Sequence, residues 1–314
     1  MTKVKNYLSL VKFSHTIFAM PFALIGFVLG LSEYGLQLEL AKLPECVYTG
    51  IPEIKVSVIS ILSHYHIITL ALVLICMVTA RSAAMAFNRY LDRSFDAKNP
   101  RTAIREIPKG IISANSALRF VIINCIVLIV ATYFINSICF YLSPVALFVI
   151  LFYSYTKRFT ALCHLVLGLG LSLAPIGAYL AVTGSFALLP VLFSLSVIFW
   201  VSGFDIIFAL QDVDFDQSQK LYSIPSVLGV KRALNVSTVL HVISAACVIA
   251  VGVYGHFHWL YWIGVVVFSG MLTYQHSIVK PDDLSKVNIA FMTANGIASV
   301  VFAVFVIADL LLLG

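Results

Sequence analysis

Long apolar runs, separated by short polar segments, extend through almost the whole chain. Each run is close to the roughly 20 apolar residues that a helix needs to cross a bilayer. Backbone polar groups must be paired inside lipid, so spans of this kind are α-helices. The pattern predicts an all-α polytopic membrane protein, a single domain over residues 1–314, with about nine transmembrane helices in one bundle. The nine predicted spans are 13–32, 57–86, 117–135, 138–156, 160–183, 189–210, 233–254, 257–275 and 290–313.

The composition agrees with a membrane protein. Hydrophobic residues make up 61% of the 314 residues and charged residues only 11%, whereas charged residues make up about 25% of an average soluble protein. The first apolar run lacks a convincing small-residue cleavage site and leads into further spans, so we interpret it as a retained span rather than a signal peptide. Residues 32–56 are expected to form an external loop without chemistry.

Lysine and arginine positions predict the orientation, because cytoplasmic loops retain these residues. With the N-terminus inside, Lys42 and Lys55 lie outside and Arg81 lies within a span. The bias predicts an inner (plasma) membrane protein with a cytoplasmic N-terminus and an external C-terminus. The net charge of +6 then reflects topology, and it gives no reason to expect a nucleic-acid partner. The inner side carries 17 of the 20 basic residues, namely Lys3, Lys5, Lys12, Arg89, Arg93, Lys98, Arg101, Arg105, Lys109, Arg119, Lys157, Arg158, Lys220, Lys231, Arg232, Lys280 and Lys286.

Three polar residues at intervals of four, Asn88, Asp92 and Asp96, follow the second apolar run. At about 100° per residue they fall within about 80° of one another on a helix, and Arg81 lies about 20° from Asn88. Neighbouring carboxylates repel each other unless a cation lies between them. Oxygen ligands at this loose spacing suit a hard divalent ion better than zinc, which predicts Mg²⁺. The alternative is a solvated helix end with ordinary surface charge.

A second acidic cluster, Asp205, Asp212 and Asp216, follows the sixth apolar run. These residues fall within about 40° on a helix, whereas Asp214 points almost opposite to Asp205. Both clusters end membrane-length runs on the predicted cytoplasmic side. We expect them to meet across the bundle and to hold metal ions against a polyanionic ligand.

Basic residues in the predicted inner loops are candidates for contacts to phosphate. Arg101 and Arg105 follow the first acidic cluster, Lys157 and Arg158 form a short loop between two spans, and Lys220 follows the second cluster. Arginine forks onto phosphate oxygens in a bidentate manner. Membrane topology alone would also explain basic residues at these positions.

Three residues of the fifth predicted span suggest packing more than chemistry. Gly168 and Gly170 lie inside the span, where small residues allow helices to approach closely, so we do not interpret them as a nucleotide-binding loop. His164 lies near the inner end of the same span and could face a substrate, although ordinary packing is favoured.

These motifs, in this order, resemble the UbiA superfamily of intramembrane prenyltransferases over nearly the whole chain. One segment of this chain resembles the first Asp-rich motif of that family. It contains Asn88, Asp92 and Asp96, followed by Arg101, Thr102, Arg105, Pro108 and Gly110. The family's second motif is similar to Asp205, Ala209, Gln211, Asp212 and Asp216, and its Tyr and Lys-Arg stretch is similar to YSYTKRFT at 153–160. The chain departs from the pattern of many members at Arg89, where they have Asp, and at Phe208, where they have Tyr.

In detail the chain resembles bacterial proteins labelled 4-hydroxybenzoate polyprenyltransferase, in the branch associated with menaquinone made through futalosine. The segments that carry this similarity are AFNR at 86–89, YQHSIV at 274–279 and the NG pair at 295–296. The resemblance implies Mg²⁺-dependent transfer of a polyprenyl chain from polyprenyl diphosphate to an aromatic acceptor in quinone biosynthesis. The acceptor would be of the 4-hydroxybenzoate or the 1,4-dihydroxy-6-naphthoate type.

The resemblance also assigns roles to residues of the two motifs. It implies that Asp92, Asp96, Asp212 and Asp216 are catalytic metal ligands, that Asn88 and Asp205 bind substrate, and that Arg101, Arg105, Lys157 and Arg158 contact the diphosphate. Two alternatives remain open. One is a family member with another acceptor, such as haem or a sugar phosphate. The other is a transporter, since polar residues in spans mark ion pathways, although acidic groups at one membrane face rather than at midplane argue against it.

Overall fold

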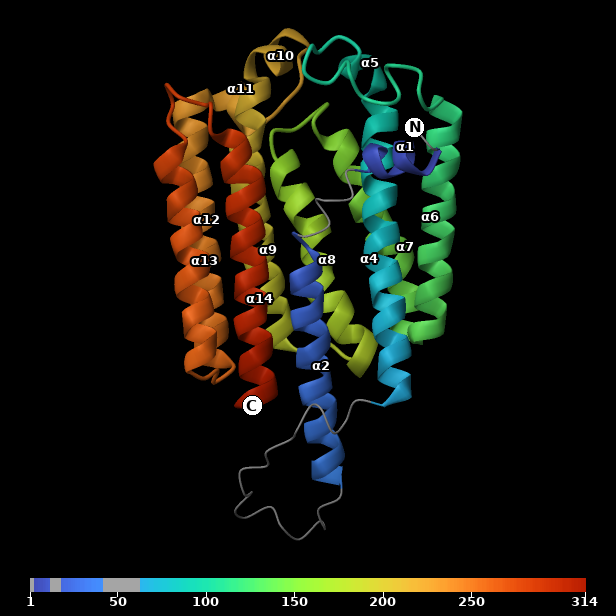
Figure 1. Cartoon of the computed structure of the whole chain (residues 1–314), viewed down its shortest axis with the longest axis vertical. Coiled ribbons are helices and arrows are strands. Elements are labelled where there is room, and N and C mark those ends of the chain that lie inside the picture. The colour runs from blue at the N-terminus through green and yellow to red at the C-terminus, as the bar shows by residue number, and fades with distance from the viewer. Residues whose placement is uncertain (1–2, 12–17, 42–62) are drawn as a thin grey trace.

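The computed structural model describes residues 3–11, 18–41 and 63–314. Nine long helices in these ranges run side by side in one bundle (Figure 1), which confirms the all-α fold class. They are α2 (Met20–Ala41), α4 (His64–Leu91), α6 (Ala114–Ile135), α7 (Ser137–Thr156), α8 (Cys163–Thr183), α9 (Leu188–Ala209), α12 (Val230–Tyr254), α13 (Trp259–Ile278) and α14 (Asn295–Leu312).

Eight of these helices are long and apolar enough to cross a membrane, and the exception is α13. The apolar run of α13 begins with Trp259 and Tyr261 and ends with Gln275 and His276, which lowers its hydropathy. It still packs against α12 and α14, parallel to the other helices (Figure 1). The chain is thus an integral membrane protein whose bundle has the predicted number of long helices.

The predicted loop at residues 32–56 is wrong at its start, because α2 continues to Ala41. Within that extension the Gln37 side chain donates a hydrogen bond of 3.1 Å to Glu33, one helical turn away, a spacing at which polar side chains support a helix. The rest of that loop, and residues 13–17 of the first predicted span, lie outside the described residues.

Close approach of α8 and α9 depends on Gly168. A Cβ atom at this position would lie 2.5 Å from the backbone oxygen of Ile198 and 2.7 Å from the Ser202 hydroxyl. At Gly170 the nearest atom would be 3.9 Å away. The predicted packing role is therefore confirmed for Gly168, whereas the structure leaves room for a side chain at Gly170.

We expect Gly168→Ala to destabilise the bundle by about 1–3 kcal/mol, the usual cost of overpacking a core. Gly170→Ala introduces the same methyl group two residues away and should leave stability near that of the wild type. Thermal unfolding in detergent, followed by size-exclusion chromatography, compares the two variants. Equal melting temperatures would show that α8 and α9 can separate at little cost.

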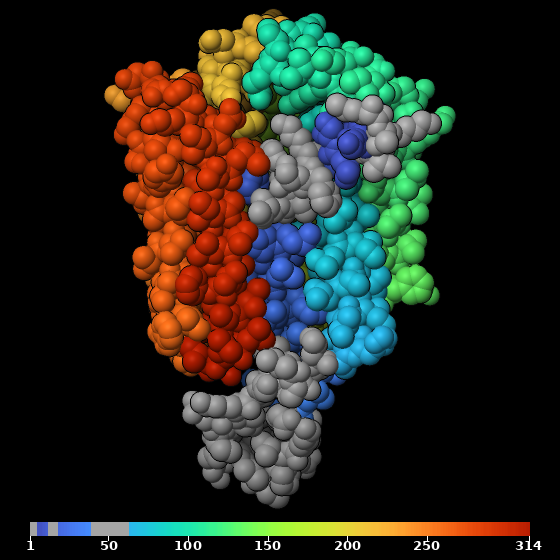
Figure 2. All heavy atoms as spheres, viewed as in Figure 1, coloured from blue at the N-terminus to red at the C-terminus, as the bar shows by residue number. Residues whose placement is uncertain are grey.

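Short helices gather near one end of the bundle, where the acidic motifs lie. They are α1 (Lys3–Leu10), α5 (Arg93–Asp96), α10 (Val213–Ser218) and α11 (Ile224–Leu228) (Figure 1). The segment around α5 adjoins α10 in the space-filling view (Figure 2), and Lys98 there donates a hydrogen bond of 3.3 Å to Gln219. The C-terminus lies at the opposite end (Figure 1). The two acidic segments are thus neighbours, as expected.

Neither acidic motif lies on one unbroken helix, contrary to the assumption behind their predicted faces. Helix α4 ends at Leu91, and Asp92 is its C-cap with a ψ of 6°. Helix α9 ends at Ala209 and passes through a 3₁₀ turn, Leu210–Asp212, into α10. Because caps and 3₁₀ turns occur at helix ends, the motifs mark where the spans stop.

Candidate active site

Two adjoining cavities lie within the bundle. A polar cavity of about 270 Å³ lies where α4 and α9 end, and an apolar cavity of about 400 Å³ lies mainly between α4, α7 and α8. Five residues line both cavities, namely Arg81, Met85, Tyr153, Leu167 and Leu171. The arrangement offers one space for a charged group and a connected space for an apolar chain.

Nine of the ten predicted site residues line the polar cavity: Asn88, Asp92, Asp96, Arg101, Arg105, Lys157, Asp205, Asp212 and Asp216. The tenth, Arg158, is not part of the lining. It donates hydrogen bonds of 2.9 Å to Asp92 Oδ1 and 3.2 Å to the Leu91 carbonyl oxygen. The geometry therefore gives Arg158 a role in holding Asp92, and its contact with a diphosphate stays a prediction.

In the first motif, both carboxylates are paired with arginine. Asp96 accepts hydrogen bonds of 2.8 and 2.9 Å from Arg105. Asp92 accepts one from Arg158 and a further bond of 3.2 Å from Asn88. Burial raises the pKa of Asp92 above that of an ordinary aspartate, and the Arg158 guanidinium offsets only part of this effect.

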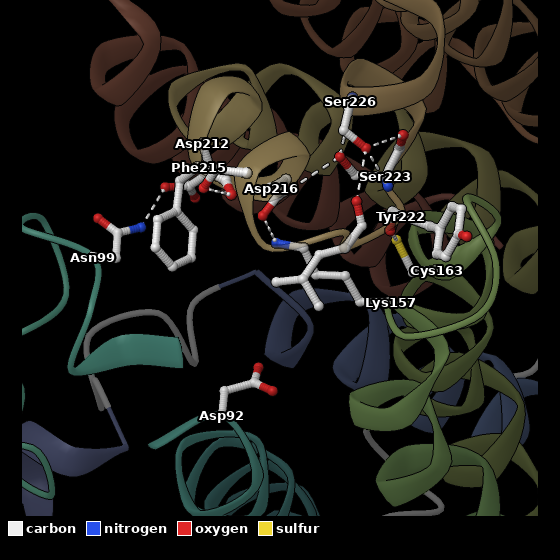
Figure 3. A network of polar contacts seen from close by, with 12 residues as sticks. Asp92, Asn99, Lys157, Cys163, Asp212, Phe215, Asp216, Tyr222, Ser223 and Ser226 are labelled. Carbon is white, nitrogen blue, oxygen red and sulfur yellow. Dashed lines mark hydrogen bonds and ion pairs between the residues drawn. The ribbon is translucent and has the colours of Figure 1, made fainter. Parts of the chain in front are cut away.

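In the second motif, each carboxylate has a cation and a neutral donor as partners. Asp212 forms a two-point ion pair with Arg101 and accepts a bond of 3.2 Å from Asn99. Asp216 lies 2.7 Å from the Lys157 ammonium and accepts a bond of 3.0 Å from Ser223 (Figure 3). Burial works to lower the pKa of Lys157, but the Asp216 carboxylate more than offsets it, so this pKa is raised.

The two motifs face each other across the polar cavity. Asp92 points from the end of α4 toward the space below Lys157 and Asp216 (Figure 3). Without ligands, four carboxylates are matched by four cations, so the site is close to charge-balanced. A divalent cation and a diphosphate carry opposite charges, so entering together they would change that balance less than either would alone.

The donor set fits Mg²⁺ in its chemistry. No group of three or more His, Cys, Asp or Glu side chains within the described ranges converges on a single metal position. Proteins usually bind Mg²⁺ through one or two carboxylates, with water and substrate phosphates completing the octahedron. Oxygen donors on two facing segments suit that mode, in which a diphosphate would complete the coordination.

A deeper layer of the site lies further along the helices. Asp205 precedes Asp212 by seven residues and Arg81 precedes Asn88 by the same interval, which is about 10 Å of helix. Arg81 makes no hydrogen bond or ion pair with any described residue, and its Nε is buried without a partner. A charged residue inside a span signals function. The sequence carried that signal for Arg81, but we predicted no role from it.

Other residues of the site lie in loops, whose position in space cannot be predicted from helical spacing along the sequence. Asn99 and Ser223 bind the second-motif carboxylates from segments outside the long helices. Lys220, considered as a diphosphate contact, is exposed and does not line the cavity. Asp214 is exposed and points away from it, as predicted.

Aromatic rings form one wall of the polar cavity. The ring centroid of Phe208 lies 4.3 Å from that of Phe291. Phe291 is part of the π-helical turn Ile289–Ala294, which precedes α14. The Arg101 guanidinium lies 5.4 Å from the centroid of the Phe208 ring. Phe208 thus supports a basic residue of the site by packing and cation–π attraction.

Sequence comparisons relate the chain to enzymes that transfer prenyl groups. Residues 57–297 match the UbiA prenyltransferase family. The 4-hydroxybenzoate octaprenyltransferase of Tolumonas auensis is 28% identical over 228 residues, which cover 73% of this chain and 79% of that protein. The enzyme of the same name from Francisella tularensis subsp. novicida is 27% identical over 231 residues, 74% of this chain and 81% of the relative.

Solved structures show the same fold. A UbiA homolog from Aeropyrum pernix K1, solved in the apo state, superposes with a TM-score of 0.72 and 26% identity, covering 94% of this chain and 96% of that one. A UbiA homolog from Archaeoglobus fulgidus, solved with GPP and Mg²⁺ bound, gives a TM-score of 0.69 and 19% identity, with coverages of 97% and 99%.

Proposed function

Because the chain belongs to the UbiA prenyltransferase family, we propose that it transfers a polyprenyl chain from polyprenyl diphosphate to an aromatic acceptor that carries both a hydroxyl and a carboxylate. The 4-hydroxybenzoate and 1,4-dihydroxy-6-naphthoate types both meet this description. The two relatives named 4-hydroxybenzoate octaprenyltransferase support the first type. Membership of the menaquinone branch through futalosine stays a prediction.

The observation that carries this proposal is the unpaired Arg81 where the polar and apolar cavities meet. Arg81 is partly buried, and a buried guanidinium nitrogen without a partner is costly, so this position favours a ligand with a negative charge. An acceptor carboxylate on Arg81 would orient the aromatic ring toward the end of the apolar cavity. The hydroxyl-bearing edge of the ring would then face the polar cavity.

We assign the diphosphate to the polar cavity. Asp92 and Asp96 on one side, and Asp212 and Asp216 on the other, would hold Mg²⁺, which when bound neutralises charge on the departing diphosphate. Arg101, Arg105 and Lys157 can exchange their carboxylate partners for diphosphate oxygens. The allylic carbon–oxygen bond breaks with its electron pair leaving on the diphosphate, a ring carbon forms the new bond, and the ring loses a proton.

The apolar cavity is the proposed site of the polyprenyl tail. Its walls come chiefly from α4, α7 and α8, and include Val73, Val149 and Leu173. These side chains exclude water from the space that adjoins the diphosphate. An allylic cation formed there is protected from hydrolysis until the acceptor attacks it.

Other acceptors fit the cavities less well. A sugar phosphate needs partners for several hydroxyls, whereas Met85, Leu167 and Leu171 around Arg81 are apolar. Transport would need a polar path through the bundle, but here the polar cavity adjoins an apolar one.

Mass spectrometry of products tests the assignment. The purified protein in detergent is given polyprenyl diphosphate, Mg²⁺ and a panel of acceptors: 4-hydroxybenzoate, 1,4-dihydroxy-6-naphthoate, haem and a sugar phosphate. We expect prenylation of one or both aromatic acids and none of the other two acceptors. Products from haem or the sugar phosphate alone would overturn the proposed acceptor class. Offering the two acids in competition identifies the preferred one.

The pKa of Asp92 gives the proposal a pH dependence. This pKa is raised, so Asp92 takes up a proton at a higher pH than an ordinary aspartate, and the protonated form is a poor metal ligand. Apparent Mg²⁺ affinity should therefore fall as the pH drops through this raised value. Arg158→Gln removes the cation that holds the pKa down, so we expect the fall to begin at a higher pH.

Half-saturating Mg²⁺ concentrations, measured across pH for the wild type and Arg158→Gln, check this expectation. Arg93→Gln is the matched control. Arg93 is exposed, and its one hydrogen bond to a described residue goes to the Tyr90 carbonyl oxygen. An unchanged curve for Arg158→Gln, or a shift to lower pH, would contradict the pairing of Arg158 with Asp92.

The proposed orientation places the active site at the cytoplasmic face of the plasma membrane. It is supported by the position of the polar cavity at the end of the bundle near α1, with the C-terminus at the other end (Figure 1). The basic residues Lys98, Arg101 and Lys157 lie at the same end as that cavity, in keeping with retention of positive charge inside.

A further inference from the structure

His164 is a buried histidine whose ring is bonded at both nitrogens. Its Nδ1 lies 2.6 Å from Asp205 Oδ2, and its Nε2 accepts a hydrogen bond of 3.3 Å from the backbone N–H of Ile224. The His164 side chain is 3% exposed, and that of Asp205 is 24% exposed toward the polar cavity. The histidine, which also lines the polar cavity, is thus bonded to a carboxylate that faces the proposed substrate.

These two contacts favour one neutral tautomer of the ring. A backbone N–H can only donate, so Nε2 must offer its lone pair to Ile224. The single proton of the neutral ring is then on Nδ1, which donates it to Asp205. Asp205 accepts this bond as a carboxylate. An imidazolium would instead place a second N–H against the N–H of Ile224.

The second oxygen of Asp205 is left for another partner. No other described residue donates a hydrogen bond to this side chain. Asp205 shares the polar cavity with Arg81 and Tyr153, two of the five residues that also line the apolar cavity. An acceptor whose carboxylate binds Arg81 would lie in the same deep layer as this oxygen.

We propose that His164 is a positioning residue that holds Asp205 charged and oriented, so that Asp205 accepts the proton lost by the acceptor. The inference rests on the proposed prenyl transfer. When the new carbon–carbon bond has formed, the ring proton passes to the free oxygen of Asp205, and the electron pair of the broken C–H bond restores aromaticity. His164 keeps its own proton throughout.

A purely structural role for His164 must be separated from this one. Ile224 begins α11 directly after Ser223, which binds Asp216. Removing the ring could therefore disturb the second motif as well as Asp205. Glutamine separates the roles, because its amide can donate to Asp205 and accept from Ile224 without titrating. Leucine fills similar space and can do neither.

The experiment compares His164→Gln and His164→Leu with the wild type for transfer to the preferred aromatic acid. We expect His164→Gln to keep kcat within a few-fold and to leave the pH profile unchanged. His164→Leu should lose on the order of 100-fold in kcat, the scale of a misplaced catalytic group. The affinity for a polyprenyl thiolodiphosphate with Mg²⁺ should stay unchanged in both variants.

His241→Gln and His241→Leu are matched controls. His241 is also buried, but it bonds to the Trp200 carbonyl oxygen and to His276 and does not line the polar cavity. Both control variants should keep kcat near that of the wild type. If His164→Leu matches the wild type, or loses thiolodiphosphate affinity to the same extent as kcat, the positioning role is wrong. A loss in His164→Gln equal to that in His164→Leu overturns it too.

A spectroscopic measurement tests the tautomer without any turnover. In protein labelled with ¹⁵N-histidine, the resonances missing from His164→Gln should report a neutral ring protonated at Nδ1. A signal of an imidazolium, or of the Nε2–H tautomer, would contradict the inference. This result does not depend on prenyl transfer. A wild type that is inactive toward every acceptor would refute the proposed function, whereas the ¹⁵N spectrum would still test the tautomer of His164.

Discussion

Replacing Asp92 or Asp212 with alanine is expected to abolish prenyl transfer, a loss of about 10³-fold or more, while the protein stays folded in the membrane. The two residues lie on opposite sides of the polar cavity, and each is proposed to hold Mg²⁺ against the diphosphate. Charge stabilisation by a bound metal contributes several kcal/mol to catalysis, and each 1.36 kcal/mol is tenfold in rate. Product formation is measured in detergent with saturating Mg²⁺.

Asp214→Ala is the matched control for both variants. It removes the same charge two residues from Asp212, but Asp214 is exposed and does not line the cavity. Its activity should stay near that of the wild type, and all three variants should elute as folded protein. Turnover near the wild-type rate in Asp92→Ala or Asp212→Ala would remove the proposed metal-binding role of that residue.

Arg81→Met is expected to reduce kcat/KM for a carboxylated acceptor by about 30-fold or more. Truncating one partner of a buried, hydrogen-bonded charge pair costs about 2–5 kcal/mol, and every 1.4 kcal/mol is tenfold. Methionine retains much of the apolar stem, so the packing of Arg81 between the two cavities is largely preserved. The rate of transfer is measured over a range of acceptor concentrations.

The acceptor itself provides the control for Arg81. Naphthalene-1,4-diol lacks the carboxylate of 1,4-dihydroxy-6-naphthoate, so the wild type and Arg81→Met should prenylate it with similar kcat/KM. An equal loss for both acceptors would mean that Arg81 acts on the diphosphate or on the fold. The carboxylate would then have another partner.

Helical periodicity was enough to predict which motif residues gather at one site. The fourfold and sevenfold spacing of Asn88, Asp92, Asp205 and Asp212 places them on inward faces, and all four line the polar cavity. The prediction holds although α4 and α9 both break within the motifs. A cap or a 3₁₀ turn changes the backbone direction over only a few residues. Side chains next to the break therefore still face the bundle.

Partners from distant segments could not be predicted in this way. Spacing along the chain does not show that Arg158 binds Asp92 while Lys157, its neighbour, binds Asp216. These pairings depend on how the segment that follows α7 lies against the end of α4 and against α10. For the same reason His164 looked like ordinary packing, because its link to Asp205 crosses from α8 to α9.

Binding of a polyprenyl thiolodiphosphate, with and without Mg²⁺, tests most directly whether two facing acidic segments hold a diphosphate through metal. The wild type, Asp92→Ala, Asp212→Ala and Asp214→Ala are titrated in detergent by calorimetry. We predict binding that requires Mg²⁺ in the wild type and in Asp214→Ala, and that is strongly weakened when either Asp92 or Asp212 is lost. Equal affinity without Mg²⁺, or undiminished binding after loss of one segment's carboxylate, would contradict the account.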